Sequence, residues 1–239
     1  MAPIVFVSGA DRGLGFALCE ELLKQDWHVF AGQYMPAWPD LSRLAGQYPE
    51  RLQIVPLDVS SVESVYAAAQ AVAEQTNYID VLVNNAGIYS PITERTIREP
   101  QDYEEMHRLY DVNALGPLRV TEAFLPLTDR GNLKRLCFIS SEAGSIARSE
   151  RTAWFGYCMS KAALNMGIKI LFNDLFPKGY TFRAYHPGWI RSYMLGEKNL
   201  EATFEPEEAA AMAIPILLGK REKEGQLALI DYEGKEWPW

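Results

Sequence analysis

The chain has few of the residues that form disulfides or bind transition metals. Its 239 residues include three cysteines and three histidines. Cys19, Cys137 and Cys158 are odd in number, are scattered, and lack the spacing of a metal site. Because disulfide frameworks use paired cysteines in oxidising compartments, we expect free thiols in a reducing compartment and no bound metal.

Long apolar runs and an excess of basic charge are also lacking. No stretch approaches the roughly 18 apolar residues that a membrane-spanning helix needs. The segment MAPIVFVSGA has no basic region before its apolar run, so no signal peptide is predicted and the cytoplasm is the expected location. The formal net charge is -8, which argues against nucleic acid or an anionic membrane as a partner.

Short apolar strands alternate with amphipathic helices along the chain. We expect strands at 3–8, 28–31, 52–56, 79–83, 135–140, 180–186 and 227–230. We expect helices at 16–25, 41–48, 60–75, 101–127, 157–176 and 207–218. This alternation predicts parallel βαβ units. The expected fold is therefore a single α/β Rossmann domain over residues 1–239, a doubly wound sheet of about seven strands with helices on both faces.

A glycine-rich loop, residues 8–15 (SGADRGLG), follows the first predicted strand and leads directly into a helix. Gly9 permits a tight turn, Gly13 lets the backbone approach a pyrophosphate, and Gly15 lets the helix pack closely on the sheet. The helix N-terminus then offers free N–H groups to phosphates. A glycine turn that binds nothing has the same composition, but this position between strand and helix favours a dinucleotide site.

The end of the second strand bears on which dinucleotide is bound. A carboxylate there would bind the ribose hydroxyls of NAD, but the strand ends in Gln33 and Tyr34 with no acid. Arg12 could pair with a 2′-phosphate, or it is a solvated loop charge. NADP(H) is therefore favoured, and NAD(H) remains possible.

Polar residues at the ends of the third and fourth strands suggest an adenosine site. Asp58 could accept a hydrogen bond from an adenine amino group, or it is a turn aspartate. The segment 84–87 (NNAG) has two asparagines that can bond backbone on both sides, and it would brace the strand and wall the site.

The strongest catalytic signal is Tyr157, four residues before Lys161 on a predicted helix. Residues at this spacing share a helix face, and a neighbouring cation lowers the pKa of a phenol, which makes Tyr157 a plausible general acid or base. Such a pair alone is common on surface helices. Here a serine at the end of the fifth strand, in Ser140-Ser141, could polarise a carbonyl. Asn113, in a helix that Gly116 also weakens, marks either a functional irregularity or a solvent-facing polar residue.

With these residues in place, the chain resembles the short-chain dehydrogenase/reductase superfamily. The resemblance rests on SGADRGLG at 8–15, Asp58-Val59, NNAG at 84–87, Asn113, Ser141, YCMSK at 157–161 and HPGW at 186–189. It is closer still to the small carbonyl reductases of the sniffer and C-factor type, through SSEAGSI, SKAALN, HPGWIRSYM and the tail DYEGKEWPW.

The resemblance implies hydride transfer between a nicotinamide and a carbonyl or alcohol. It implies that Tyr157 donates the proton, Lys161 holds the nicotinamide ribose, Ser141 rather than Ser140 orients the carbonyl, and Asn113 holds a relay water. Pro187 to Ile190, with Ser192, would hold the carboxamide. Tyr34 departs from the pattern, because NADP-preferring relatives often carry Arg there. The implied cofactor contacts are Gly9, Asp11, Arg12, Gly13, Leu14, Gly15, Gln33, Asp58, Val59, Asn85, Ala86, Gly87, Lys161, Pro187, Gly188, Ile190 and Ser192.

Aromatic residues in the loops after strands four, five and six predict a hydrophobic carbonyl or alcohol as substrate. They are Tyr89, Trp154, Trp189 and Tyr193, and packing in the core or at an interface is the alternative. Residues 192–204 are a candidate lid, and the tail 237–239 would cover the site edge or pack in a dimer. The resemblance implies a homodimer or homotetramer. The competing function is a nucleotide-binding signalling protein of the same fold.

Overall fold

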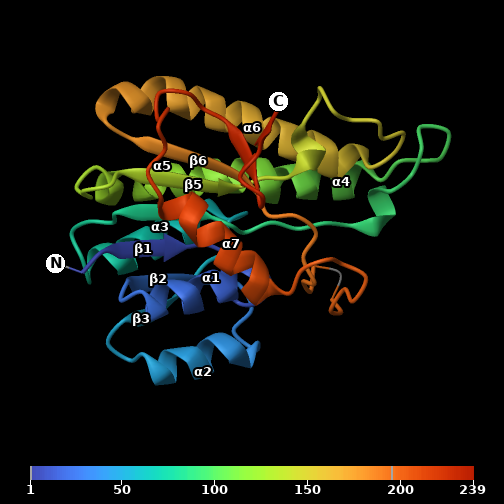
Figure 1. Cartoon of the computed structure of the whole chain (residues 1–239). Coiled ribbons are helices and arrows are strands. Elements are labelled where there is room, and N and C mark those ends of the chain that lie inside the picture. The colour runs from blue at the N-terminus through green and yellow to red at the C-terminus, as the bar shows by residue number, and fades with distance from the viewer. Residues whose placement is uncertain (1, 195) are drawn as a thin grey trace.

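The computed structural model describes residues 2–194 and 196–239 and contains one eight-stranded sheet between two helical layers (Figure 1). The strand order is β3-β2-β1-β4-β5-β6-β7-β8, in which the first seven strands are parallel and β8 is antiparallel to β7. The strands are β1 (Ile4–Val7), β2 (His28–Gln33), β3 (Leu52–Pro56), β4 (Val81–Asn84), β5 (Arg135–Ile139), β6 (Thr181–His186), β7 (Leu229–Asp231) and β8 (Glu236–Trp237).

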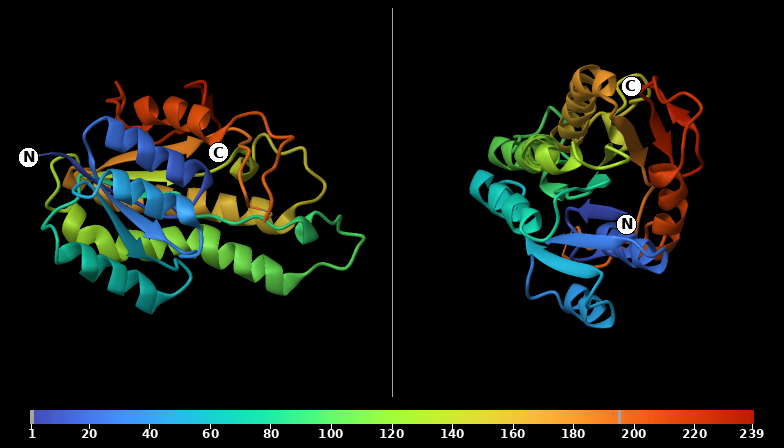
Figure 2. Two further views of the ribbon diagram at one scale, coloured as in Figure 1. Left: turned by 90° about the horizontal axis from the view of Figure 1, so that it is seen from below. Right: turned by 90° about the vertical axis from the view of Figure 1, so that its left-hand side faces the viewer.

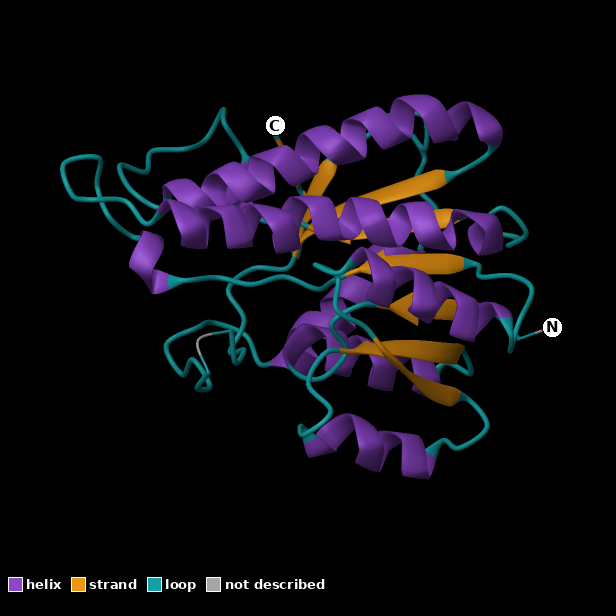
Figure 3. Ribbon diagram, turned by 180° about the vertical axis from the view of Figure 1, so that it is seen from behind, coloured by secondary structure: helices purple, strands orange, loops and turns teal. Residues whose placement is uncertain are grey.

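The helices form two layers because alternate strand residues point to opposite faces. Val5 and Val7 of β1 pack with α1 (Gly13–Lys24), α2 (Pro39–Gln47) and α7 (Pro206–Leu218) on one face. Phe6 packs with the other layer, and Figure 3 shows the long helices of that layer from behind. That layer contains α3 (Val62–Ala73), α4 (Tyr103–Tyr110), α5 (Gly116–Thr128) and α6 (Phe155–Leu175).

The predicted α/β Rossmann fold is confirmed, with two local differences. The helix predicted over 101–127 is interrupted by a π-helical turn at Asp111–Leu115, so the irregularity expected near Asn113 is present. The sequence reading missed β8, because a two-residue strand has no periodicity. The tail therefore extends the sheet of its own chain.

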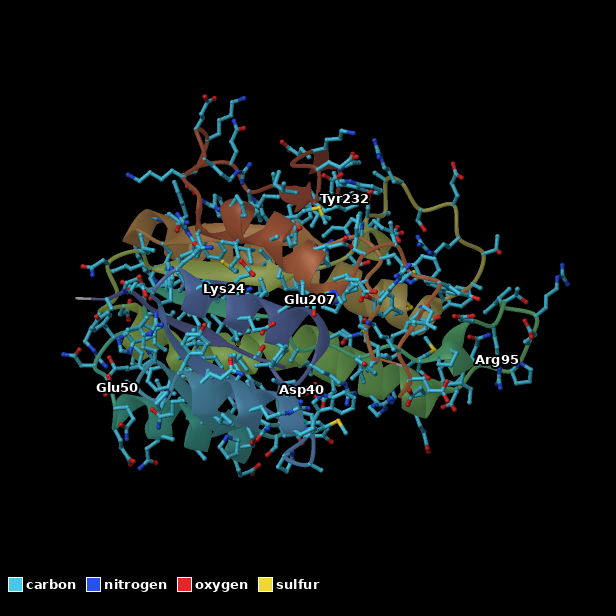
Figure 4. The ribbon with its side chains drawn as sticks, turned by 60° about the horizontal axis from the view of Figure 1, so that its bottom comes forward. Lys24, Asp40, Glu50, Arg95, Glu207 and Tyr232 are labelled. Atoms are coloured by element: carbon cyan, nitrogen blue, oxygen red, sulfur yellow. The ribbon has the colours of Figure 1, made fainter. Side chains whose placement is uncertain are left out.

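The loops that follow β4, β5 and β6 project from one end of the sheet, beyond the carboxyl ends of the parallel strands (Figure 2). In Figure 4, Arg95 lies at the outer end of the first of these segments and Glu50 lies at the opposite end of the molecule. The candidate lid at 192–204 is in the third loop, and its residue Leu195 lies outside the described residues. This end of the sheet is where an open α/β sheet binds its ligands.

Two expectations from composition concern membrane-spanning helices and disulfides. In residues 2–194 and 196–239, no helix has the length and apolar character to cross a bilayer. Cys19, Cys137 and Cys158 are unpaired, and the first two are buried in the core.

Candidate active site

Tyr157 lies in the first turn of α6, and its phenol is close enough to the hydroxyl of Ser141, which follows β5, for that hydroxyl to lower its pKa. Trp154 directs the chain into the helix with φ of 69°, a left-handed conformation that is rare for a bulky side chain. The Ser141 hydroxyl also accepts a hydrogen bond from the Ala143 N–H at 3.1 Å. The two hydroxyl groups predicted to contact a carbonyl are therefore adjacent.

Lys161 shares a helix face with Tyr157 as predicted, but its ammonium group extends past the phenol. Its Nζ lies 5.8 Å from the Tyr157 ring centre and donates to the Ile139 carbonyl at 3.1 Å. Burial lowers the pKa of Lys161 to about 8. Burial also raises the pKa of Tyr157 to about 12, with a smaller contribution from the Glu142 carboxylate. The expectation that Lys161 lowers the pKa of Tyr157 is thus wrong for the protein without cofactor.

Asn113 is fully buried in the π-helical turn, so the solvent-facing alternative is wrong. Its Oδ1 accepts from the Ile88 N–H at 2.8 Å, and its Nδ2 donates to the Ile88 carbonyl at 2.9 Å. The same Nδ2 donates to Ser160 Oγ at 3.1 Å, and Ser160 Oγ donates to the Tyr157 carbonyl at 2.7 Å. Asn113 therefore joins the loop after β4 to the helix that carries Tyr157.

The two serines after β5 have different partners. Ser140 Oγ donates to Asn165 Oδ1 at 2.6 Å, and Asn165 Nδ2 donates to the Gly144 carbonyl at 3.1 Å. Ser140 therefore holds the loop after β5 against α6. Ser141, the serine that the resemblance favours for orienting the carbonyl, is the one that lies beside Tyr157.

The segment 84–87 was expected to brace the fourth strand, and it also braces the glycine loop. Ser8 Oγ accepts from the N–H groups of Asn85 and Ala86 at 3.0 and 3.1 Å, and Asn85 Nδ2 donates to the Ser8 and Gly9 carbonyls at 2.9 Å. A Cβ on Gly9, which has φ of +65°, would lie 2.8 Å from Ala86 Cα. A Cβ on Gly15 would lie 2.1 Å from the Gly9 carbonyl oxygen. Both positions require glycine, so the loop keeps its backbone amides accessible.

At the adenosine end, Asp11 has a role that sequence reasoning missed. Its carboxylate accepts from the backbone N–H groups of Tyr34 and Met35 at 3.1 and 2.8 Å, which ties the glycine loop to the end of β2. Gln33 Nε2 is buried and has no protein partner in the described chain. A buried donor without a partner fits the oxygens of a ribose or its phosphate. Asp58 Oδ1 accepts from the Ser60 N–H at 2.9 Å, so this carboxylate acts as a turn aspartate, which was the alternative to an adenine contact.

At the nicotinamide end, glycines again leave room. A Cβ on Gly87 would lie 3.4 Å from Asn113 Oδ1 and 3.7 Å from Lys161 Nζ. Gly188 has φ of +78° and follows Pro187, and Ile190 pairs with Phe204 in an isolated bridge. Beside this segment, Ser192 lies against the glycine loop, since its Cβ is 3.5 Å from the position of a Cβ on Gly13. The loop after β6 therefore reaches the glycine loop. The described residues contain no cluster of metal-ligating side chains.

The predicted substrate residues divide into two groups. The Tyr89 ring lies 5.4 Å from the Tyr157 ring and 5.5 Å from the Trp154 ring, so these three aromatics form one wall. Trp189 is 54% exposed at the edge, whereas Tyr193 contacts Trp38 on the far side of the loop.

An ion pair extends this wall, and the sequence reading missed it. Arg151 pairs with Glu142 and lies 5.1 Å over the Trp154 ring. The two charges are nine residues apart in an irregular loop, so no periodicity indicates that they meet.

The tail holds the loop between Ser141 and Tyr157. Ser145 Oγ donates to the Pro238 carbonyl at 2.6 Å, and the Ala147 N–H donates to the Trp239 carbonyl at 3.0 Å. The Trp237 ring packs 5.7 Å from His186. The tail is therefore fixed against the loop that precedes Tyr157, and both of its predicted roles stay predictions.

Comparison with known proteins agrees with this geometry. The model of the short chain dehydrogenase family matches residues 3–203. The chain is 37% identical to C-signal of Myxococcus xanthus over 69% of this chain and 95% of that protein. The structure of the NADPH-bound carbonyl reductase from chicken fatty liver is similar over 100% of this chain and 99% of that one, with 30% identity and a TM-score of 0.87. The carbonyl reductase Sniffer of D. melanogaster shares the fold over the full length of both chains, with a TM-score of 0.87 and 24% identity.

Proposed function

From the premise that the chain belongs to the short chain dehydrogenase family and is an oxidoreductase, we propose that it reduces hydrophobic aldehydes or ketones with NADPH. One observation carries the proposal. The hydroxyls of Ser141 and Tyr157 are adjacent beside Lys161, at the carboxyl end of the sheet that also carries the glycine loop. A binding protein has no need of such an arrangement, which argues against the signalling alternative.

The roles of the residues follow from chemistry that each can perform. The bound nicotinamide supplies the hydride. Ser141 and Tyr157 would both hydrogen-bond to the substrate carbonyl oxygen, where negative charge develops. Because the pKa of Tyr157 is about 12 in the free protein, its phenol is protonated at neutral pH and is ready to donate a proton.

Lys161 and Asn113 would support the proton transfer. Lys161 is placed to hold the nicotinamide ribose, and hydrogen bonds to the bound cofactor would stabilise its ammonium form. Asn113 Oδ1 and Lys161 Nζ both face the backbone at Gly87, so Asn113 lies close enough to Lys161 for the proposed relay.

The preference for NADP(H) over NAD(H) is supported at the adenosine end. No acid stands at the end of β2 to repel a 2′-phosphate, and the Gln33 side chain offers an unpartnered donor. Arg12 lies in the same region, above the end of β2. The similar chicken carbonyl reductase was solved with NADPH bound. The remaining proposed cofactor contacts are those implied by the sequence, namely Gly9, Asp11, Gly13, Leu14, Gly15, Asp58, Val59, Asn85, Ala86, Gly87, Lys161, Pro187, Gly188, Ile190 and Ser192.

The substrate class is proposed from the wall beside Tyr157. The Tyr89 ring packs between the Tyr157 and Trp154 rings. Trp189, in the loop after β6, offers a further exposed aromatic surface. Such surfaces favour an aromatic or aliphatic carbonyl compound over a sugar. Tyr193 stays a proposed substrate contact from the loop after β6.

Tyr157→Phe is the test. With NADPH and a panel of aromatic aldehydes, diketones and quinones, we expect the native protein to turn over and the variant to lose at least about 10²-fold in kcat. Binding of NADPH should persist in the variant. The matched control is Tyr89→Phe, which keeps the ring contacts and should keep turnover. Tight NADPH binding without turnover of any compound would favour the signalling alternative.

We also propose a homodimer or homotetramer that forms through the helices of the α4–α6 layer. Met159, Met166 and Ile170 project from one side of α6 at helical spacing and are 58–62% exposed. Leu118 of α5 is exposed in the same layer. Sedimentation velocity of the native protein and of Ile170→Glu tests this, since a charge at a subunit interface should produce monomers.

A further inference from the structure

Three segments that are distant in sequence meet beside the glycine loop. The guanidinium carbon of Arg12 lies 4.9 Å from the Trp38 ring centre. The opposite contact of the same indole is with Tyr193, whose ring centre is 4.9 Å away at an interplanar angle of 64°. Trp38 thus connects the glycine loop, the β2–α2 loop and the loop after β6.

The indole is held in place from its own loop. Trp38 Nε1 donates to Asp40 Oδ2 at 2.9 Å, and Asp40 is the acidic residue in the first turn of α2, as Figure 4 shows. The preceding residues Tyr34 and Met35 are tied to Asp11 through their backbone N–H groups. Because both ends of residues 34–38 are anchored, Trp38 is a fixed platform.

The platform leaves the binding edge of Arg12 available. A guanidinium group donates its hydrogen bonds in its own plane, so stacking on its face does not block them. Nη1 approaches Met35 Sδ at 2.6 Å, whereas Nε and Nη2 donate to no group in the described chain. A planar pair of free donors matches a phosphate.

We propose that Trp38 determines the cofactor preference: it holds Arg12 in the orientation that binds the 2′-phosphate of NADPH, and its contact with Tyr193 links that event to the substrate-side loop. This inference rests on the proposed NADPH function. Without the indole, Arg12 must lose rotamer freedom on binding, and the cation–π contribution of about 1 kcal/mol is lost. NADH has no 2′-phosphate, so it gains nothing from the platform.

Calorimetric titration with two fragments, 2′,5′-ADP and 5′-AMP, tests the proposal without turnover. We expect the native protein to prefer 2′,5′-ADP. Trp38→Leu should lose about five- to tenfold of that preference while its affinity for 5′-AMP stays unchanged. Trp38→Phe keeps an aromatic face and should retain part of the preference. An unchanged affinity for 5′-AMP shows that the variant is folded at the site.

The outcomes separate this inference from the function on which it rests. If the native protein does not prefer 2′,5′-ADP, the NADPH proposal itself fails. If the native protein prefers it and Trp38→Leu prefers it equally, the role of Trp38 is refuted. Tyr193→Leu should keep the preference for 2′,5′-ADP over 5′-AMP. In the native protein the link predicts a lower substrate KM with NADPH than with NADH, and this difference should disappear in Tyr193→Leu. Retention of that difference would refute the link between the two loops.

Discussion

Replacing Lys161 by methionine should stabilise the protein without cofactor while it abolishes turnover. Burial lowers the pKa of Lys161 from 10.5 to about 8, so the folded protein disfavours the charge that the lysine carries at neutral pH. Because one pKa unit corresponds to about 1.4 kcal/mol, the drop from 10.5 to about 8 lowers the free energy of unfolding by about 3 kcal/mol at neutral pH. The lost hydrogen bond to Ile139 offsets about 1 kcal/mol, so we expect a net gain of about 2 kcal/mol.

The gain should depend on pH with a defined sign. Between pH 8 and 10.5 the unfolded chain binds a proton at this lysine that the folded chain has released, so the stability of the native protein rises with pH through that window. At about pH 9.5 the penalty has fallen to about 1 kcal/mol, which is similar to the contribution of the hydrogen bond that the variant lacks. The two proteins should then have similar stability.

Urea unfolding of both proteins without cofactor, at about pH 6.5 and about pH 9.5, measures this difference. Lys169→Met is the matched control, because Lys169 is exposed on the same helix and should show a small effect that does not change with pH. The reasoning is refuted if Lys161→Met is less stable than the native protein at the lower pH. It is also refuted if the difference between the two proteins is the same at both pH values.

Two further predictions concern the loop after β5. Ser141→Ala should lower kcat by about 10²–10³-fold, as steady-state kinetics would show. Ser140→Ala should retain turnover but lose about 1–2 kcal/mol of unfolding free energy, measured by urea unfolding, because only Ser140 supports Asn165. Truncation after Trp237 removes the carbonyls that accept from Ser145 and Ala147, so the substrate KM should rise several-fold while the affinity for 2′,5′-ADP stays the same; an unchanged KM would show that the tail does not position this loop.

The sequence predicted the fold and the members of the site where local pattern decides position. A glycine trio between a strand and a helix has few structural solutions, and Gly9 and Gly15 leave no room for a Cβ in this one. Four-residue spacing on a helix placed Tyr157 and Lys161 on one face. The irregular turn at Asn113 was predictable because two poor helix formers lie three residues apart.

Contacts between loops were not predictable in the same way. The Glu142–Arg151 pair, the Arg12–Trp38–Tyr193 contacts and the docking of the tail join residues with no shared period. Each depends on where the sheet places the ends of different loops. The pairing of β8 with β7, which sequence periodicity did not indicate, places the tail against the loop after β5.

The error in the expected pKa of Tyr157 has a cause that bears on function. Sequence spacing shows that a cation is near the phenol, but it does not show how far both groups are removed from water. In the folded protein burial is the larger effect at each group, and it raises the pKa of Tyr157 to about 12 while it lowers the pKa of Lys161 to about 8. Both shifts favour the neutral forms. A protonated phenol is the form that gives a proton to a reduced carbonyl, but a raised pKa makes that phenol a weaker acid than an exposed tyrosine. The proton transfer that we propose therefore requires a bound cofactor whose positive charge lowers the pKa of Tyr157 again.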